Sequence, residues 1–170
     1  EKIRYGIVGC GSMGREHIEN IRALAGGHVT AIADPHAPSR SLAQALFDAP
    51  PREFENHNDL IASGLCDALV IATPNSTHID VLRDALATEL HILVEKPLCT
   101  TIEDGVELLR RAEGRRALVW VGQEYRYMPP VAELIRMAHA GDVGRVHQVA
   151  SCSRGFRSRR IELRAQRYRL

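Results

Sequence analysis

Short apolar runs alternate with segments of helical spacing along most of this chain. Strand-like runs occupy residues 3–8, 29–33, 68–72, 91–94 and 117–121, and helical spacing occupies 39–47, 76–87 and 102–112. Continuous apolar strands are typical of a sheet covered on both faces, and parallel strands need a crossover helix between them. The pattern therefore predicts an α/β domain with a parallel sheet and flanking helices.

The pattern changes beyond residue 122. A Met-Pro-Pro sequence at 128–130 ends the alternating block, and helical spacing resumes over 131–138. A Gly-Asp-Val-Gly turn follows at 141–144, and residues 145–150 have the composition of one more strand. Residues beyond 122 are therefore predicted to start a second domain rather than to add another strand and helix to the same sheet.

A glycine-rich turn, Gly-Cys-Gly-Ser-Met-Gly at 9–14, lies between the first strand and the first helical segment. In a dinucleotide-binding turn of this spacing, Gly9 permits the reversal, Gly11 lets the backbone approach a pyrophosphate, and Gly14 lets helix and strand pack closely. The free N–H groups at the helix start then hold the phosphates. Together with the alternation, this turn predicts a Rossmann-type fold.

Asp34 ends the second strand, 20 positions after Gly14. Such an acid commonly accepts hydrogen bonds from the adenosine ribose of a dinucleotide, although Asp before Pro35 is also a common turn residue. A carboxylate here would repel the 2′-phosphate of NADP, so NAD is favoured as the cofactor. Arg40 lies near enough in sequence to reverse part of that preference if the loop folds back.

Composition limits the other classes. With 45% hydrophobic and 25% charged residues, the chain is typical of a folded domain, and no apolar run approaches the roughly 20 residues that span a bilayer. The four cysteines show no CxxC pairing, which favours reduced thiols in a cytoplasmic protein over disulfides or a zinc site, and no metal site is expected. Cys10 inside the turn is interpreted as a small packing residue.

Five segments in order resemble the glucose-fructose oxidoreductase, inositol dehydrogenase and rhizopine-catabolism family (Gfo/Idh/MocA). Besides the glycine turn, they are Ala-Thr-Pro-Asn-Ser-Thr-His at 72–78, Glu-Lys-Pro-Leu at 95–98, and the run 121–129 with Gly-Asp-Val-Gly-Arg-Val at 141–146. The resemblance covers residues 2 to 150. It implies a nicotinamide-dependent oxidoreductase that moves hydride to or from a sugar or polyol hydroxyl carbon.

The resemblance also implies roles for individual residues. Lys96 is implied to be catalytic, contacting cofactor and substrate and assisting proton transfer, and Arg126 is a candidate substrate contact with a structural ion pair as its alternative. The residues expected to bind the cofactor are Gly9, Gly11, Ser12, Met13, Gly14, Asp34, Thr73, Asn75, His78, Glu95 and Lys96. Taken alone, His78 is more typical of a packed helix-face histidine.

The resemblance implies three parts: a dinucleotide-binding Rossmann domain at 1–122, the start of a second, α+β substrate and oligomerisation domain at 123–150, and a basic tail at 151–170. The family pattern implies a chain about twice this long, and no D-x-x-x-H pair follows Lys96. The tail holds seven arginines and one glutamate. We interpret this tail as a cut or altered remnant of a full enzyme. The alternatives are a basic arm that binds nucleic acid or membranes, and a new helix packed on the domain.

We therefore expect an NAD(P)-dependent oxidoreductase, incomplete in this form and homo-oligomeric at full length, acting on a small sugar or polyol rather than on membranes or nucleic acid. The alternative is a non-catalytic NAD-binding or regulatory module, which the missing D-x-x-x-H pair favours. A basic, nucleic-acid-binding function of the tail ranks last.

Overall fold

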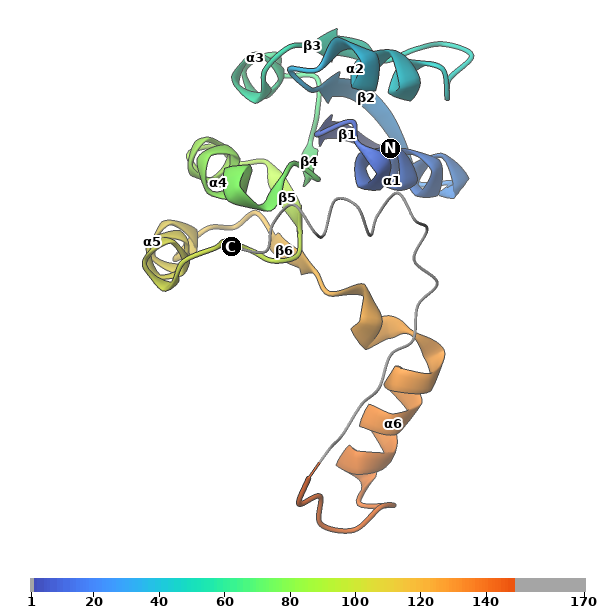
Figure 1. Ribbon diagram of the computed structural model, residues 1–170, viewed down its shortest axis with the longest axis vertical. Helices are drawn as coiled ribbons and strands as arrows, with labels where there is room; N and C mark the ends of the chain where they lie inside the picture. Colours follow the sequence, from blue (N-terminus) through green and yellow to red (C-terminus); the bar gives the residue numbers. More distant parts are fainter. Residues whose placement is uncertain (1, 149–170) are drawn as a thin grey trace, which may run out of the picture. The chain divides into compact units, whose positions relative to one another are not determined.

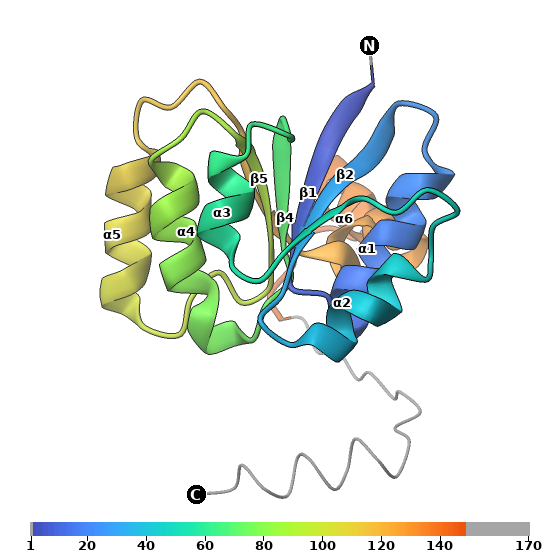
Figure 2. The same ribbon diagram turned by 90° about the horizontal axis from the view of Figure 1, so that it is seen from above.

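Six parallel strands form a single sheet in the order β3-β2-β1-β4-β5-β6 (Figures 1 and 2). The computed structural model describes residues 2–148. The strands are β1 Ile3–Val8, β2 Gly27–Ala33, β3 Arg52–Phe54, β4 Ala68–Ile71, β5 His91–Glu95 and β6 Val119–Gly122. The helices are α1 Ser12–Ala23, α2 Ala37–Gln44, α3 His57–Ala62, α4 His78–Leu86, α5 Ile102–Ala112 and α6 Pro129–Ala140, with short 3₁₀ turns η1 Asn75–Thr77 and η2 Glu124–Tyr127.

Helices cover both faces of the sheet, as Figure 2 shows: α3, α4 and α5 on one face and α1 and α2 on the other. Strand β4 explains why both faces need cover, because Leu69 and Ile71 join the core under α3–α5 while Val70 joins the core under α1 and α2. All four residues of β4 are buried. Each such aliphatic side chain contributes about 1.5–3 kcal/mol when it leaves water, so this continuous apolar run stabilises two layers at once.

Helices α3 and α5 begin where the sequence supplies a side-chain partner for a free N–H group. Thr101 caps α5 by accepting from Asp104 N at 3.1 Å, and Asn56 caps α3 by accepting from Asp59 N at 2.9 Å. Helix α1 has no side-chain cap, although it starts at the centre of the sheet edge. Its free N–H groups are therefore left for another acceptor.

The strand order changes direction between β1 and β4. From β1 the chain runs outward through β2 and β3, then returns to β4 and continues to β5 and β6 on the other side. In open parallel sheets, ligands bind outside the carboxyl ends of the strands at such a switch point. The turn after β1 and the loop after β4 both lie there.

The predicted Rossmann-type sheet with flanking helices is confirmed, with differences in detail. The sequence prediction missed β3, because Arg52–Phe54 is a three-residue edge strand with one apolar residue, too short to show a period. Residues 145–148, the described part of the expected strand at 145–150, are not in a strand.

The chain divides into two compact units, Glu1–Glu124 and Tyr125–Leu170, and α6 belongs to the second (Figure 1). The three-part division at 122 and 150 stays a prediction, and the predicted basic tail at 151–170 lies outside the described residues. Among residues 2–148 no helix has both the length and the apolar character to cross a bilayer.

Candidate cofactor site

Two glycines of the turn are required by the packing of the chain itself. Gly9 has a φ of 96°, and a Cβ there would lie 2.6 Å from the carbonyl carbon and oxygen of Ala72. A Cβ on Gly14 would lie 1.8 Å from the carbonyl oxygen of Gly9. Any larger residue at either position would force the turn, the start of α1 and the end of β4 apart.

Gly11 is different, because nothing in the described structure lies within 4 Å of the position where its Cβ would stand. Its φ of −66° is one that any residue adopts. Neither packing nor backbone conformation therefore asks for glycine at this position. The space beside its Cα is open for an approaching ligand.

The start of α1 offers N–H groups to that space. The first helical bond runs from Arg15 N to Gly11 O at 3.1 Å, so the amides of Ser12 and Met13 lie outside the helical ladder. The first turn of α1 contains no acidic residue and no side-chain cap. These amides and the helix dipole form a site suited to a phosphate.

Asp34 braces the turn from the end of β2. Its Oδ2 accepts a hydrogen bond from Cys10 N at 2.7 Å, and its Oδ1 accepts from His36 N at 2.8 Å. A carboxylate has about four lone-pair sites, so each oxygen can still accept a hydrogen bond from a ribose hydroxyl. Asp34 can thus hold the turn and a ligand together.

Cys10 is a packing residue, as its place in a tight turn suggested. Its side chain is fully buried, and its Sγ lies 3.8 Å from Ala33 O. Burial, and next the neighbouring Asp34 carboxylate, raise the pKa of this thiol to about 12. A thiol held protonated in this way is inert as a nucleophile.

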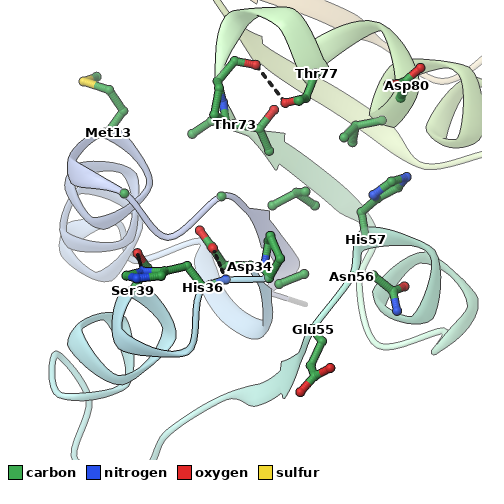
Figure 3. Close-up of a pocket in the computed structure, with 18 of the residues that line it drawn as sticks. Met13, Asp34, His36, Ser39, Glu55, Asn56, His57, Thr73, Thr77 and Asp80 are labelled. Atoms are coloured by element: carbon green, nitrogen blue, oxygen red, sulfur yellow. Dashed lines mark hydrogen bonds between the residues drawn. The ribbon is translucent and has the colours of Figure 1, made fainter. Parts of the chain in front are cut away.

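A cavity of about 690 Å³ opens at this edge of the sheet (Figure 3). Of the residues predicted to bind a cofactor, it is lined by Gly9, Gly11, Ser12, Met13, Asp34 and Thr73. The sequence reasoning missed other polar residues that line it, namely His36, Ser39, Glu55, Asn56, His57, Thr77 and Asp80. Glu55, Asn56 and His57 directly follow β3, so their place on the wall could not be foreseen without that strand.

Arg40 does fold back, but away from a role in phosphate binding. Its Nη1 donates to the carbonyl oxygen of Asp34 at 2.6 Å, and its guanidinium lies 3.9 Å from Glu53 and 3.7 Å from Glu55. The side chain is 10% exposed and Arg40 does not line the cavity. With Asp34 and Glu55 on the wall, this end of the cavity disfavours a second phosphate, which supports the preference for NAD.

Thr73 supplies one independent sign of a missing partner. Its hydroxyl oxygen is buried and has no hydrogen-bond partner among the described residues, although Thr73 lines the cavity. A buried hydroxyl without a partner costs about 1–3 kcal/mol. The open Gly11, the free amides of α1 and this hydroxyl all fit a polar, phosphate-bearing ligand such as a dinucleotide.

The other predicted residues lie outside the cavity wall. Asn75 begins η1, Glu95 ends β5, one strand beyond β4, and Lys96 directly follows it. Lys96 is 53% exposed and its Nζ lies 3.8 Å from Glu124 Oε1. The peptide bond between Lys96 and Pro97 is cis. Lys96 therefore stands at the same sheet edge as the cavity but does not line it.

His78 is fully buried between two loops of this edge. Its Nδ1 lies 2.7 Å from Pro97 O and its Nε2 lies 3.0 Å from Thr73 O. Arg126, the candidate substrate contact, is an exposed residue of η2 in the second unit. His78 does not line the cavity.

Comparison with known proteins agrees with this site. The sequence matches, over residues 3–123, the family described as an oxidoreductase family with an NAD-binding Rossmann fold. It is 36% identical over 166 residues to inositol 2-dehydrogenase 4 of Saccharopolyspora erythraea, covering 92% of this chain and 48% of that protein. It is 32% identical over 149 residues to the rhizopine catabolism protein MocA of Rhizobium meliloti, covering 88% and 46%.

Among solved structures, myo-inositol dehydrogenase from Lactobacillus casei in complex with NAD(H) and myo-inositol superposes with a TM-score of 0.80 at 25% identity. The alignment covers 85% of this chain and 43% of that one. The chain thus spans a little under half the length of these relatives. The expected cofactor, NAD, agrees with the family, and the match over most of the chain places this protein in the Gfo/Idh/MocA family of oxidoreductases.

Proposed function

We propose that this chain is the NAD-binding half of an oxidoreductase that moves hydride between nicotinamide and a carbon bearing a sugar or polyol hydroxyl. The observation that carries the proposal is the cavity at the switch point, walled by the glycine turn, Asp34 and Thr73. Relatives named for inositol dehydrogenation support the substrate class. Because the chain spans under half of a relative's length, the activity and the substrate of the whole protein are part of this proposal.

Under this proposal the dinucleotide lies across the carboxyl edge of the sheet, with its adenosine half near β2 and its nicotinamide half near β4 and β5. Asp34 at the end of β2 would hold the adenosine ribose, and the amides of Ser12 and Met13 would hold the pyrophosphate. Because β4 and β5 lie on the opposite side of β1 from β2, the nicotinamide half would lie towards Thr73 and Lys96. Asn75, Glu95 and Gly14 would contribute through the loops and the close packing that shape this path.

Lys96 would handle the proton side of the reaction. Nicotinamide, when bound, supplies the carbon that accepts or returns a hydride. The Lys96 ammonium would hydrogen-bond the substrate hydroxyl and stabilise its oxygen while a partner group takes the proton, leaving a carbonyl as the C–H bond breaks. Lys96 is one of only two lysines among 22 basic residues. A lysine ammonium can give up and regain a proton, whereas an arginine guanidinium stays charged.

The remaining expectations extend the proposal to the full-length protein. Arg126 would contact a substrate hydroxyl, and the full-length protein would be a homo-oligomer without nucleic-acid or membrane partners. Three cysteines in the described residues are free, Cys10, Cys66 and Cys99. Free thiols support a reducing, cytoplasmic location.

The test of cofactor binding is a fluorescence titration of the chain with NADH, with NADPH in parallel. Saturable binding that favours NADH supports the proposal. The Gly11→Val chain is the control, because valine would fill the open space without disturbing any neighbour. Equal NADH binding by both chains would place the ligand elsewhere and contradict the proposal.

A non-catalytic NAD-binding or regulatory module is the second candidate, favoured by the exposure of Lys96 outside the cavity. The two candidates differ in what Lys96→Ala changes. In the full-length protein, under the first candidate, the substitution lowers NADH formation with a polyol substrate by about 100-fold or more, within the range for a proton-transferring group. Under the second candidate, neither the full-length protein nor its Lys96→Ala variant turns over any polyol, while both bind NADH.

A further inference from the structure

Lys96 has little to hold its own side chain in place. Its ion-pair partner, Glu124, is 52% exposed, and the Lys96 Nζ lies 3.8 Å from the Glu124 Oε1. Exposed pairs of this kind contribute about 0–1 kcal/mol. If Lys96 acts on a substrate, its position must come from the segment that carries it, residues 95–97.

The residue before Lys96 is anchored to α1. Glu95 Oε1 accepts from His17 Nε2 at 2.9 Å, with side chains 12% and 20% exposed, and Glu95 Oε2 accepts from Lys96 N at 3.2 Å. His17 stands on the helix whose N-terminus faces the cavity. One side of the segment is therefore tied to the phosphate-binding helix.

The residue after Lys96 is anchored to α4. His78, the first residue of that helix, is fully buried with Nδ1 at 2.7 Å from Pro97 O and Nε2 at 3.0 Å from Thr73 O. A neutral imidazole donates to only one of these two carbonyl oxygens at a time, whereas a protonated ring donates to both. His78 thus joins the segment of Lys96 to the loop that carries Thr73 on the cavity wall.

We infer that His17 and His78 are positioning residues that hold the segment 95–97 from both sides and thereby set where Lys96 meets the nicotinamide half of the ligand. Neither histidine lines the cavity. A buried polar side chain is costly unless its hydrogen bonds are made, and here His17 donates to Glu95 while His78 lies within hydrogen-bond distance of Pro97 O and Thr73 O. The inference rests on the proposed function and adds two residues to it.

The test separates the two halves of the ligand by calorimetric titration of the 170-residue chain with NADH and with ADP. ADP carries only the adenosine and phosphate half. The variants are His17→Leu and His78→Leu, which remove the hydrogen bonds, and His17→Gln and His78→Asn, which keep a donor. His91→Leu is the matched control, because His91 begins the same strand at its opposite end and its side chain accepts from Leu118 N, far from segment 95–97.

We expect the leucine variants to weaken NADH binding by about tenfold, equivalent to about 1.4 kcal/mol, with ADP binding unchanged within about twofold. The amide variants should recover most of the NADH affinity, and His91→Leu should change neither ligand. A general loss of structure would weaken NADH and ADP together. If the fully buried His78→Leu does not fold, His78→Asn and the partly exposed His17 variants still decide the question.

The outcomes separate a failure of the proposed cofactor binding from a failure of the positioning role of the two histidines. If the unmodified chain binds neither ligand, the proposed function is wrong and the positioning role falls with it. If the unmodified chain binds both, and the histidine variants change NADH and ADP equally or change neither, the proposed function stands and the positioning role is wrong.

Discussion

The two ends of the ligand path are built very differently. Around the glycine turn, backbone contacts, the braced Asp34 carboxylate and the buried Cys10 determine the shape without any ligand. Around Lys96, the side chain is half exposed and only its neighbours are tied down. The difference shows that the glycine turn is shaped by contacts within the chain, whereas near Lys96 only the flanking residues Glu95 and Pro97 are held by contacts from other elements.

The largest effect that would break this comparison is expected from Gly14→Ala. The new Cβ would lie 1.8 Å from the carbonyl oxygen of Gly9, and such overpacking costs about 1–3 kcal/mol or more. That loss outweighs the gain of about 1 kcal/mol that alanine brings to a helix. Urea unfolding would measure it. A chain as stable as the original would mean that the turn is looser than its contacts indicate.

Gly11→Val tests the same turn for the ligand alone. Because its surroundings are open, valine should change the free energy of unfolding by less than about 1 kcal/mol, within the usual range for surface substitutions and helix starts. NADH binding should weaken by about tenfold or more, since the side chain would occupy the space of the pyrophosphate. Calorimetry and urea unfolding on the same sample separate the two effects. A large loss of stability would show that the chain itself needs this glycine.

Thr73→Val should weaken NADH binding and raise the free energy of unfolding. Removing a buried hydroxyl that has no partner should stabilise the chain by about 1 kcal/mol, whereas NADH affinity should fall by about threefold. Thr77→Val is the matched control, because the Thr77 hydroxyl donates to Pro74 O at 2.8 Å and its removal should destabilise the chain. Thermal unfolding and NADH titration measure both. Destabilisation by Thr73→Val would mean that its hydroxyl is already satisfied.

The smallest expected effect lies far from the cavity, at Asp67, and sharpens the comparison by showing what an exposed ion pair does. A side-chain hydrogen bond from Arg4, and next the Arg4 backbone N–H, lower the pKa of Asp67 from 3.8 to about 2. The stabilisation is complete above the ordinary value and disappears as the pH falls through about 2. Asp67→Asn should therefore be less stable at pH 7 and converge with the original chain in acid. A difference that stays constant across a urea series from pH 7 to 2 would contradict this.

Much of the adenosine and phosphate half could be predicted because its signals are local. The glycine spacing and the strand before it place Gly9, Gly11 and Gly14, and Asp34 is fixed by the length of one crossover. Thr73 follows from the next strand along. Signals of this kind survive in sequence because each concerns a turn or a strand end within a few residues.

The opposite wall of the cavity could not be predicted in the same way. His57 and Glu55 reach it only because β3 pairs with β2, and three residues with a single apolar side chain carry no period. Nor does sequence spacing show that Arg40 turns to Glu53 and Glu55 rather than to a ligand. Both facts depend on which edge strand lies beside β2.

By itself, the sequence determined the family, the parallel sheet, the glycine turn and the acid that ends β2, because each follows from periodicity or from the conformational freedom of single residues. Only the tertiary structure decided that His17 and His78, 61 positions apart in the chain, anchor the two neighbours of Lys96. It also decided that Lys96 stays outside the cavity. Those relations arise from parallel strands and crossover helices that bring distant residues to one edge of the sheet, and no local pattern records that meeting.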